Sequence, residues 1–292
     1  MAKIICQIKE MDINGKPRPI TLYSRDDLKK QKELYARYAP FLAGFTHSSV
    51  YSFIPGFSNF DAAAAASHFL RAFDYFMIID IQRCYPSMRR DLLFSMLLEI
   101  LREREARVIC GYVFCCPEGI SEGSPLPSAM SNIYLRDFDQ DMSMPPATFY
   151  LRYCDGILFL SNIFLSNISP AELFPHIENA LLDYGLPINS EKFSAGLIKE
   201  AVRFLGYVIT ANGIAIKPEK AIGLVERLRG ESNPKKRDKM AKGFKAYYRS
   251  PIFLSICEES LEYLGRYGKK EDLRIFNGRL NDEMEYNPEG AL

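Results

Sequence analysis

The chain has 292 residues, of which 48% are hydrophobic and 25% charged, and its formal net charge is +1. This length and composition fit a globular protein of one large or two modest domains with an ample core. A net charge so close to zero excludes a surface that is basic overall, so any basic nucleic-acid-binding surface must be local.

Cysteine usage and apolar runs narrow the class further. The seven cysteines are odd in number and lack Cys-x-x-Cys spacing, which argues against a disulfide framework and a zinc site. This cysteine usage indicates a protein that is located in the reducing cytosol. No apolar run is long enough to span a bilayer, and the amino-terminal residues lack the layout of a signal peptide. We therefore expect a cytoplasmic protein without a membrane partner.

In the first half of the chain, periodicity and capping residues predict helices at 25–39, 61–70 and 91–105 and a strand at Tyr75–Asp80. Ser24 and Asp27 form the capping pair of the first helix, and Pro40 marks its end. Asp61 caps the alanine-rich second helix. The charged end of the third helix, at 102–105, is expected to face solvent.

A Gly- and Pro-rich turn separates the two halves of the chain. The turn covers 117–127, further helices are predicted at 128–138 and 171–184, and hairpins are predicted at 149–160 and 203–216. Helices that alternate with strands indicate a sheet covered by helices, of the α+β or α/β class.

Two apolar strands each carry a lone acidic residue. Asp80 ends the first strand, and Asp155 lies in the middle of the later segment 149–160. A carboxylate at the end of a buried strand is unfavourable unless its charge is compensated, and Mg²⁺ prefers one or two carboxylates plus substrate phosphates. Laid side by side, the strands would hold two metals roughly 3.5–4 Å apart for phosphoryl transfer. Alternatively, Asp80 caps a helix near Pro86, and Asp155 and Gly156 form a hairpin turn.

The segment 234–249 is basic, with seven Lys or Arg residues against one Asp, interleaved with Phe244, Tyr247 and Tyr248. Two interpretations stay open. The segment is a solvated helix face, or its cations track a phosphate backbone while bases or sugars stack on the aromatic rings.

Seven segments carry a resemblance to a known family. They are Lys-Pro-Arg-Pro-Ile at 16–20, Phe-Ile-Pro-Gly-Phe-Ser at 53–58, the stretch from Asp80 to Ser87, Gly-Ile-Ser-Glu-Gly-Ser-Pro-Leu at 119–126, Tyr-Cys-Asp-Gly at 153–156, Leu-Pro-Ile-Asn-Ser-Glu-Lys at 186–192 and Phe-Leu-Gly-Tyr at 204–207. In this order they resemble the motifs of the bacterial reverse transcriptases, the group that includes retron, group II intron and phage-defence (abortive-infection) enzymes. The resemblance covers most of the chain, from residue 16 to residue 207.

The resemblance implies an α+β fold, that of a right-hand polymerase. Fingers and a palm, an antiparallel sheet covered by helices, would occupy 1–217, and a short helical thumb and a tail would occupy 218–292. The small size, with no maturase or nuclease extension, favours the retron or phage-defence branches.

The resemblance also implies a metal site. Asp80 and Asp155 would be the catalytic residues and would hold two Mg²⁺ ions, with Mn²⁺ as an alternative, and the backbone carbonyl of Ile81 would be a further ligand. One ion would activate the primer 3′-hydroxyl and the other would grip the triphosphate.

Five residues are implied in nucleotide binding: Arg18, Tyr85, Glu122, Gly123 and Lys192. Arg18 would approach the triphosphate, and Tyr85 would close the sugar pocket against a 2′-hydroxyl. The backbone at Gly123 would approach a template base or nucleotide closely, and Lys192 would protonate or attract the leaving pyrophosphate. The alternatives are an ordinary core aromatic at Tyr85 and a surface lysine at Lys192.

Contacts with the template and primer are implied for two further segments. The expected residues are Phe204, Leu205, Gly206 and Tyr207 in a primer-supporting turn, and Lys235, Lys236, Arg237 and Lys239 in the thumb.

Two positions depart from the family pattern. Gly156 stands where the family has the second aspartate of Tyr-x-Asp-Asp, so a supplementary metal ligand is missing and metal affinity or rate should be lower. Glu122 stands where the family has a glutamine. Its negative charge beside a triphosphate is unfavourable unless a cation such as Arg18 or Arg83 pairs with it.

We therefore expect an RNA-directed DNA polymerase, a nucleotidyltransferase that adds dNTPs to a primer 3′-hydroxyl in a bacterial retron-like or phage-defence system. Its partners would be an RNA template, such as a dedicated non-coding RNA, a DNA or RNA primer, and dNTPs; a homo-oligomer or a partner protein is left open. The alternatives are protein-primed or template-independent DNA synthesis, and a catalytically weakened polymerase-derived scaffold that binds RNA.

Overall fold

The computed structural model describes residues 6–13, 16–143, 148–162, 170–199, 201–216, 227 and 230–237. The chain divides into two compact units, Met1–Glu200 and Ala201–Leu292. The predicted boundary after residue 217 stays a prediction, and most of the predicted thumb lies outside the described residues.

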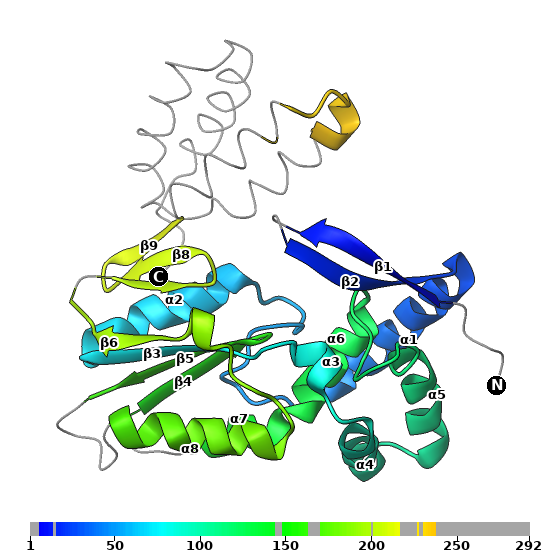
Figure 1. The fold of residues 1–292 in the computed structure, drawn as a ribbon, viewed down its shortest axis with the longest axis horizontal. Coiled ribbons are helices and arrows are strands. Elements are labelled where there is room, and N and C mark those ends of the chain that lie inside the picture. The colour runs from blue at the N-terminus through cyan, green and yellow to red at the C-terminus, as the bar shows by residue number, and fades with distance from the viewer. Residues whose placement is uncertain are drawn as a thin grey trace, which may run out of the picture. The chain divides into compact units, whose positions relative to one another are not determined.

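In the first unit, the described residues form a four-stranded antiparallel sheet (Figure 1). Its strand order is β4 (Thr148–Tyr153), β5 (Gly156–Ser161), β3 (Tyr75–Asp80) and β6 (Ser194–Leu197). The predicted strand that ends at Asp80 and the predicted hairpin around Asp155 are confirmed. Apolar runs rich in β-branched and aromatic residues favour such strands.

The other elements of this unit supply the helices and a separate two-stranded hairpin. They are β1 (Cys6–Ile13), β2 (Lys16–Tyr23), α1 (Arg25–Ala43), α2 (Asn59–Phe69), η1 (Leu70–Ala72), α3 (Cys84–Ser87), α4 (Arg90–Ile100), α5 (Glu103–Val113), α6 (Pro125–Tyr134), α7 (Arg136–Met142), α8 (Pro170–Asp183) and η2 (Ser190–Lys192).

Side chains of the sheet alternate between two faces, as in any β-strand. In β3, Met77 and Ile79 are buried on one face, whereas Ile78 and Asp80 on the other face are half-buried. Figure 1 shows α2 on one side of the sheet and α7 and α8 on the other. The mixed α+β fold, an antiparallel sheet covered by helices, is therefore confirmed.

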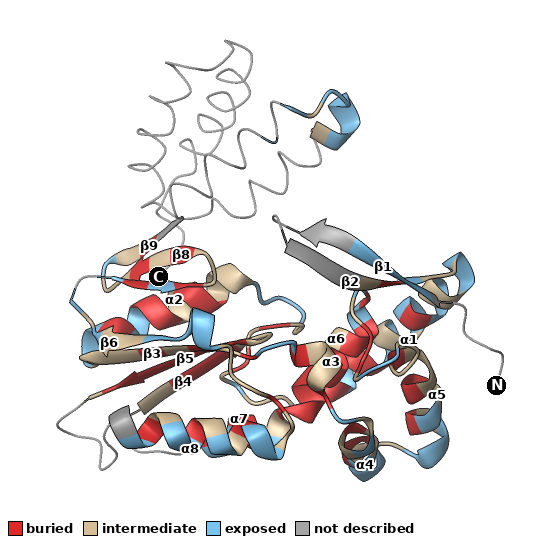
Figure 2. Cartoon of the chain, viewed as in Figure 1, coloured by how far each residue is buried: buried red, intermediate tan, exposed pale blue. Residues whose placement is uncertain are grey.

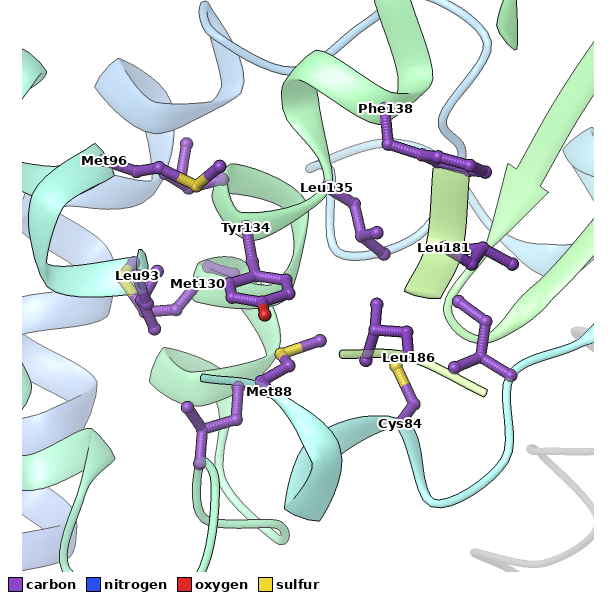
Figure 3. Packing of buried hydrophobic residues seen from close by; sticks show 14 of the residues in the cluster. Cys84, Met88, Leu93, Met96, Met130, Tyr134, Leu135, Phe138, Leu181 and Leu186 are labelled. Carbon is purple, nitrogen blue, oxygen red and sulfur yellow. The ribbon is translucent and has the colours of Figure 1, made fainter. Parts of the chain in front are cut away.

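The face of the sheet that carries Met77 and Ile79 belongs to one large hydrophobic cluster. Buried residues follow the inward sides of α4 to α8, shown in red in Figure 2. Figure 3 shows the centre of the cluster, where Tyr134 and Leu135 lie among Met88, Met130 and Leu186. Each such side chain contributes roughly 1.5–3 kcal/mol when fully buried, so this cluster fixes the strands that carry the two aspartates.

The predicted helix 91–105 is wrong in its extent, because two helices, α4 and α5, cover this part of the chain. Leu101 has an extended backbone with φ −129° and ψ 157° and ends α4. Glu105 accepts the backbone N–H of Arg102 at 3.4 Å, as the third residue of a new helix often does. The charged stretch 102–105 therefore starts a helix rather than ending one.

The predicted helix 128–138 also differs from the structure. It begins earlier, at Pro125, because a proline without an N–H suits the first turn of a helix. It is interrupted at Leu135, after which α7 begins.

Two helix ends in the first half of the chain are corrected as well. The first helix continues past Pro40 to Ala43, so this proline lies inside the helix and removes one of its backbone hydrogen bonds. Ser58 rather than Asp61 caps α2, and the Asp61 carboxylate accepts the Ser58 N–H at 2.7 Å in a capping box. The predicted capping pair of Ser24 and Asp27 is confirmed.

In the second unit, the described residues form a three-stranded sheet of β7 (Val202–Phe204), β8 (Tyr207–Thr210) and β9 (Gly213–Ile216). The predicted hairpin at 203–216 is confirmed, but a tight turn at Leu205 and Gly206, with φ +52° and +84°, interrupts its first strand. Residues 234–237 are helical. None of the helices that the structure describes is long and apolar enough to cross a membrane.

Candidate active site

Asp80 ends β3 and Asp155 directly precedes β5, so the two residues lie at the same end of the sheet. Asp80 is the last residue of β3 and pairs with Gly156, the residue after Asp155. The N–H of Ile81 donates to the carbonyl oxygen of Asp155 at 2.9 Å. The fold thus brings together the backbones of the two aspartates that the sequence singled out, and Ile81 links them by its N–H.

The Asp80 carboxylate has a cation beside it. Lys192 Nζ lies 2.7 Å from both carboxylate oxygens, and Asn189 Nδ2 donates to one of them at 3.3 Å. The Asp80 side chain is 18% exposed and that of Lys192 is 44% exposed. Asp80 therefore does not cap a helix. Lys192, although partly exposed, is fixed by an ion pair with Asp80.

Backbone pairing holds the segment that carries Lys192 against β3. The N–H of Gln82 donates to the carbonyl of Pro187 at 2.8 Å, and the N–H of Asn189 donates to that of Asp80 at 2.8 Å. The Asn189 side-chain oxygen accepts the N–H of Glu191 at 3.2 Å and so caps η2. Asn189 therefore links the Asp80 carboxylate to the short helix that presents Lys192.

Asp155 lies in a two-residue turn whose other member is Cys154, since Tyr153 pairs with Gly156. Cys154 has φ +56°, a left-handed conformation that costs about 1–2 kcal/mol for a residue other than glycine. Gly156 instead has the extended backbone of β5 and no positive φ. The hypothesis of a turn made by Asp155 and Gly156 is thus wrong by one residue, and the turn does not require this glycine.

Beneath this turn lies a buried ion pair that the sequence analysis missed. The side chains of Arg152 and Asp139 are both 0% exposed, and two guanidinium nitrogens donate to the two carboxylate oxygens at 2.7 Å. Burial alone would lower the pKa of Arg152, but the charge and hydrogen bonds of Asp139 outweigh it and raise that pKa. An arginine inside the apolar strand 149–153 was the available signal, because a buried guanidinium needs a carboxylate.

Two thiols near the carboxylates stay protonated. Burial, together with the nearby charge of Asp155, raises the pKa of Cys154 to about 12. The same two causes raise the pKa of Cys84 above its ordinary value. Since a metal binds the thiolate rather than the thiol, the raised pKa values make both cysteines poor metal ligands.

The donor set at this end of the sheet suits a hard divalent cation. Asp80 and Asp155 offer carboxylate oxygens, which Mg²⁺ prefers, and Mg²⁺ sites often use only one or two carboxylates and substrate phosphates. Among the described residues, no three His, Cys, Asp or Glu side chains gather as a metal-binding group. The pair therefore fits Mg²⁺ only together with oxygen atoms of a substrate or of the backbone.

Tyr85 lies on α3, five residues after Asp80, and packs against the hydrophobic cluster. Its hydroxyl donates to Ser128 Oγ at 3.2 Å, and its carbonyl accepts the N–H of Ile120 at 2.9 Å. Burial raises the pKa of the phenol above its ordinary value, so the ring is neutral. The core contacts and the predicted sugar-pocket role are compatible, and the role stays a prediction.

The loop that holds Glu122 and Gly123 packs on β2. The N–H of Thr21 donates to the Glu122 carbonyl at 2.9 Å. Gly123 has φ +114°, and a Cβ there would lie 2.7 Å from the side chain of Ile20. Packing on β2 therefore requires a glycine at this position, and the predicted approach to a nucleotide stays a prediction.

The two cations considered for Glu122 lie in different surroundings. Arg83 donates to Glu118 at 2.9 Å, and both side chains are 67% exposed. Arg18 lies in β2 opposite Met11, but its side chain lies outside what the structure describes.

The predicted template and primer contacts lie in the second unit. Phe204 and Tyr207 are buried and flank the tight turn at Leu205 and Gly206. Lys235, Lys236 and Arg237 lie on the helical stretch 234–237, and Lys236 forms an ion pair with Glu231 at 2.6 Å. Lys239 lies outside the described residues.

Sites that hold two metal ions are used by polymerases, and also by nucleases and phosphatases. The family described as "Reverse transcriptase (RNA-dependent DNA polymerase)" matches residues 8–209 of the sequence. The chain belongs to this family. No curated protein matches the sequence.

Solved telomerase structures share the fold. The Candida albicans telomerase in complex with a TWJ fragment of telomeric RNA has a TM-score of 0.56 and 14% identity, over 98% of this chain and 55% of the telomerase chain. For the corresponding Candida tropicalis complex the TM-score is 0.57 and the identity 13%, over 89% and 53% of the two chains. This chain therefore spans about half the length of those telomerase chains, and at such identities the likeness concerns the fold alone.

Proposed function

We propose that this protein is an RNA-directed DNA polymerase in which Asp80 and Asp155 hold two Mg²⁺ ions and dNTPs are added to a primer 3′-hydroxyl. We further propose that it works in a bacterial retron-like or phage-defence system, on an RNA template such as a dedicated non-coding RNA. The family membership and the order of the seven sequence motifs support this assignment.

One observation carries the proposal, the placement of the two carboxylates. Asp80 and Asp155 come from segments far apart in the sequence, yet the β3–β5 pairing and the bond from Ile81 to Asp155 bring their backbones together. Phosphoryl transfer needs positioning and charge neutralisation more than a protein nucleophile. Bound there, the metals would activate the attacking hydroxyl and neutralise charge on the triphosphate.

The chain's own residues would do the remaining work. The Lys192 ammonium lies beside Asp80 and would hold a proton close to the leaving pyrophosphate. The neutral Tyr85 ring, fixed through Ser128 and the core, would limit the space beside the sugar. Buried Arg152 would remain charged and keep its contacts beneath the turn of Asp155.

The test is incorporation of a radiolabelled dNTP on poly(rA) primed with oligo(dT), with Mg²⁺ or Mn²⁺ and the full chain. Asp80→Asn and Asp155→Asn should each abolish incorporation, because an amide keeps the shape but loses the charge that holds the metals. Asp183→Asn, an exposed aspartate at the end of α8, is the matched control and should behave as the wild type. Activity that survives in both site variants would exclude this metal site.

A second candidate function is a polymerase-derived scaffold that binds RNA without catalysis. The observation that favours it is Gly156, which leaves the described part of the site without a third carboxylate. A scaffold would bind RNA in a filter assay and show no dNTP incorporation with either metal. The Asp80→Asn and Asp155→Asn variants would bind RNA as tightly as the wild type. Metal-dependent incorporation by the wild type would exclude it.

A further inference from the structure

Arg152 is a fully buried arginine next to the last residue of β4, and its guanidinium contacts two different parts of the fold. Its Nε and Nη2 donate to the two carboxylate oxygens of Asp139 on α7, each at 2.7 Å. Its Nη1 donates to the carbonyl oxygen of Cys154 at 3.0 Å. One side chain thus connects a helix of the core to the turn that carries Asp155.

Further buried groups complete the hydrogen bonds of the pair. Tyr150 donates its hydroxyl to Asp139 at 2.6 Å, and Asn132 accepts from Arg152 Nη2 at 3.3 Å. The Asn132 amide in turn donates to the carbonyl of Ser52 at 2.8 Å. Because a guanidinium is planar and its donors are fixed relative to one another, anchoring one edge on a carboxylate also fixes the direction of the remaining donor.

Arg152 has no direct access to the face of the sheet on which Asp80 lies. Arg152 pairs with Ile157, which also pairs with Ile79, whereas Asp80 pairs with Gly156. Since side chains alternate along each strand, Arg152 and Asp80 point to opposite faces. The direct contact of Arg152 with the turn that carries Asp155 is therefore its bond to the Cys154 carbonyl.

The held turn is also strained. Cys154 has φ +56°, a conformation that residues other than glycine adopt only when their surroundings impose it. The bond from Arg152 to the Cys154 carbonyl is such a constraint. If it were lost, the turn would be free to relax and the Asp155 carboxylate would shift relative to Asp80.

We propose that Arg152 is a positioning residue: anchored by Asp139, it holds the Cys154 carbonyl and fixes the turn that presents Asp155 beside Asp80. The proposal deepens the proposed function and rests on it, because Asp155 matters in this way only as a metal ligand. Outer partners of metal ligands typically change metal affinity or activity by about 10- to 100-fold when mutated.

The test measures Mn²⁺ binding to the nucleotide-free full chain, by the loss of the free-ion electron paramagnetic resonance signal, next to the midpoint of urea unfolding. The double variant Arg152→Met with Asp139→Leu replaces the buried ion pair by apolar side chains, an exchange that proteins often tolerate. We expect cooperative unfolding to persist while Mn²⁺ affinity falls by about 10-fold or more. Retained affinity in the folded double variant would overturn the proposal.

Two further variants complete the design. Tyr150→Phe removes one hydrogen bond to Asp139 but leaves Arg152 bound to Asp139 and to Cys154, so its Mn²⁺ affinity should equal that of the wild type. Arg152→Lys keeps the buried charge but not the fork that reaches both partners, and it should lose affinity. This variant decides the question if the double variant does not fold, and unchanged affinity in it would overturn the proposal.

Asp155→Asn separates failure of this inference from failure of the proposed function. If the wild type binds Mn²⁺ no better than Asp155→Asn, the metal site itself is wrong, and the positioning role is wrong with it. If the wild type binds Mn²⁺ better than Asp155→Asn but the Arg152 variants match the wild type, the positioning role alone is wrong.

Discussion

Gly156 lies opposite Asp80 in the β3–β5 pair, so a side chain at this position would stand on the same face of the sheet as the Asp80 carboxylate. The extended backbone of Gly156 is open to any L residue, because its φ is not positive. The backbone therefore does not explain the glycine, and a carboxylate placed here would join the donor set.

Gly156→Asp should increase dNTP incorporation, since it adds a ligand beside Asp80. Without metal the new charge repels Asp80, so the melting temperature should fall, and Mg²⁺ should restore it. Gly156→Asn, of equal size and without charge, is the control and should show neither effect. Incorporation that stays at the wild-type level in a folded Gly156→Asp protein would mean that two carboxylates suffice.

Tyr85→Ala should admit ribonucleotides while dNTP use falls only modestly, because the ring near the Asp80 strand would no longer limit the space beside the sugar. Competition between labelled dNTPs and rNTPs measures the change. Tyr85→Phe, which loses only the hydroxyl bond to Ser128, should keep the wild-type preference. An unchanged preference in Tyr85→Ala would leave this residue with its packing role alone.

At the scale of elements, α3 and the loop 117–124 depend on each other. Ile120 donates its N–H to the Tyr85 carbonyl, and Ser121 donates its N–H to that of Val113 on α5. A Cβ at Gly119, where φ is +52°, would lie 2.2 Å from the Tyr85 carbonyl oxygen and 2.4 Å from that of Pro86. The loop is thus packed on the backbone of the helix that carries Tyr85.

Gly119→Ala should therefore lower the free energy of unfolding by about 2–4 kcal/mol, from both the overpacking and the left-handed backbone. Urea unfolding measures this, and the KM for dNTPs should rise because Tyr85 is displaced. Gly56→Ala is the matched control, since Gly56 also has a positive φ but no atom within 4 Å of the added Cβ. It should cost only about 1–2 kcal/mol. Equal losses in the two variants would contradict the packing argument.

At the scale of the whole molecule, charge is balanced, with a formal net charge of +1. Binding to a nucleic acid would therefore depend on local cations, such as those on the helical stretch 234–237 of the second unit. Lys236 already forms an ion pair with Glu231, so its interaction with a phosphate would be weaker than that of an unpaired lysine.

Neutralising Lys235, Lys236, Arg237 and Lys239 together should weaken binding to a template–primer duplex with little effect on the fold. The slope of log affinity against log salt should flatten by about three to four units, at roughly 0.9 per phosphate contact on duplex DNA. Lys236→Gln alone should change the slope least. Unchanged affinity and slope in the fourfold variant would make this helix a solvated face.

Local sequence signals predicted the strands better than the helix ends. β3 and the β4–β5 hairpin are mostly apolar, and a lone acid in each was visible without knowledge of the partner. The breaks at Leu101 and Leu135 were not predictable, because leucine is a good helix former and continues the apolar pattern. Tertiary packing decides these breaks.

Contacts between distant residues were the part of the site that the sequence could not show. Lys192 lies 112 residues after Asp80 in the chain, and its ion pair exists only because the segment 186–192 docks on β3. Asp139 was not expected to pair with Arg152, since it lies on a helix end rich in exposed acids. Such pairs depend on topology, which residue type and spacing do not encode.

The central place of β3 has a consequence for the order in which the protein is made. Both of its neighbours, β5 and β6, come later in the chain, and the last pairing partner of β3 is Leu197, opposite Tyr75. During synthesis, the apolar strand that ends at Asp80 therefore has no strand partner until residues 156–161 of β5 have been made, and its second edge stays open until residue 197. Unpaired apolar strands of this kind are prone to aggregate. Slow translation or depletion of chaperones should therefore cause more aggregation of nascent chains that end before residue 197 than of longer chains.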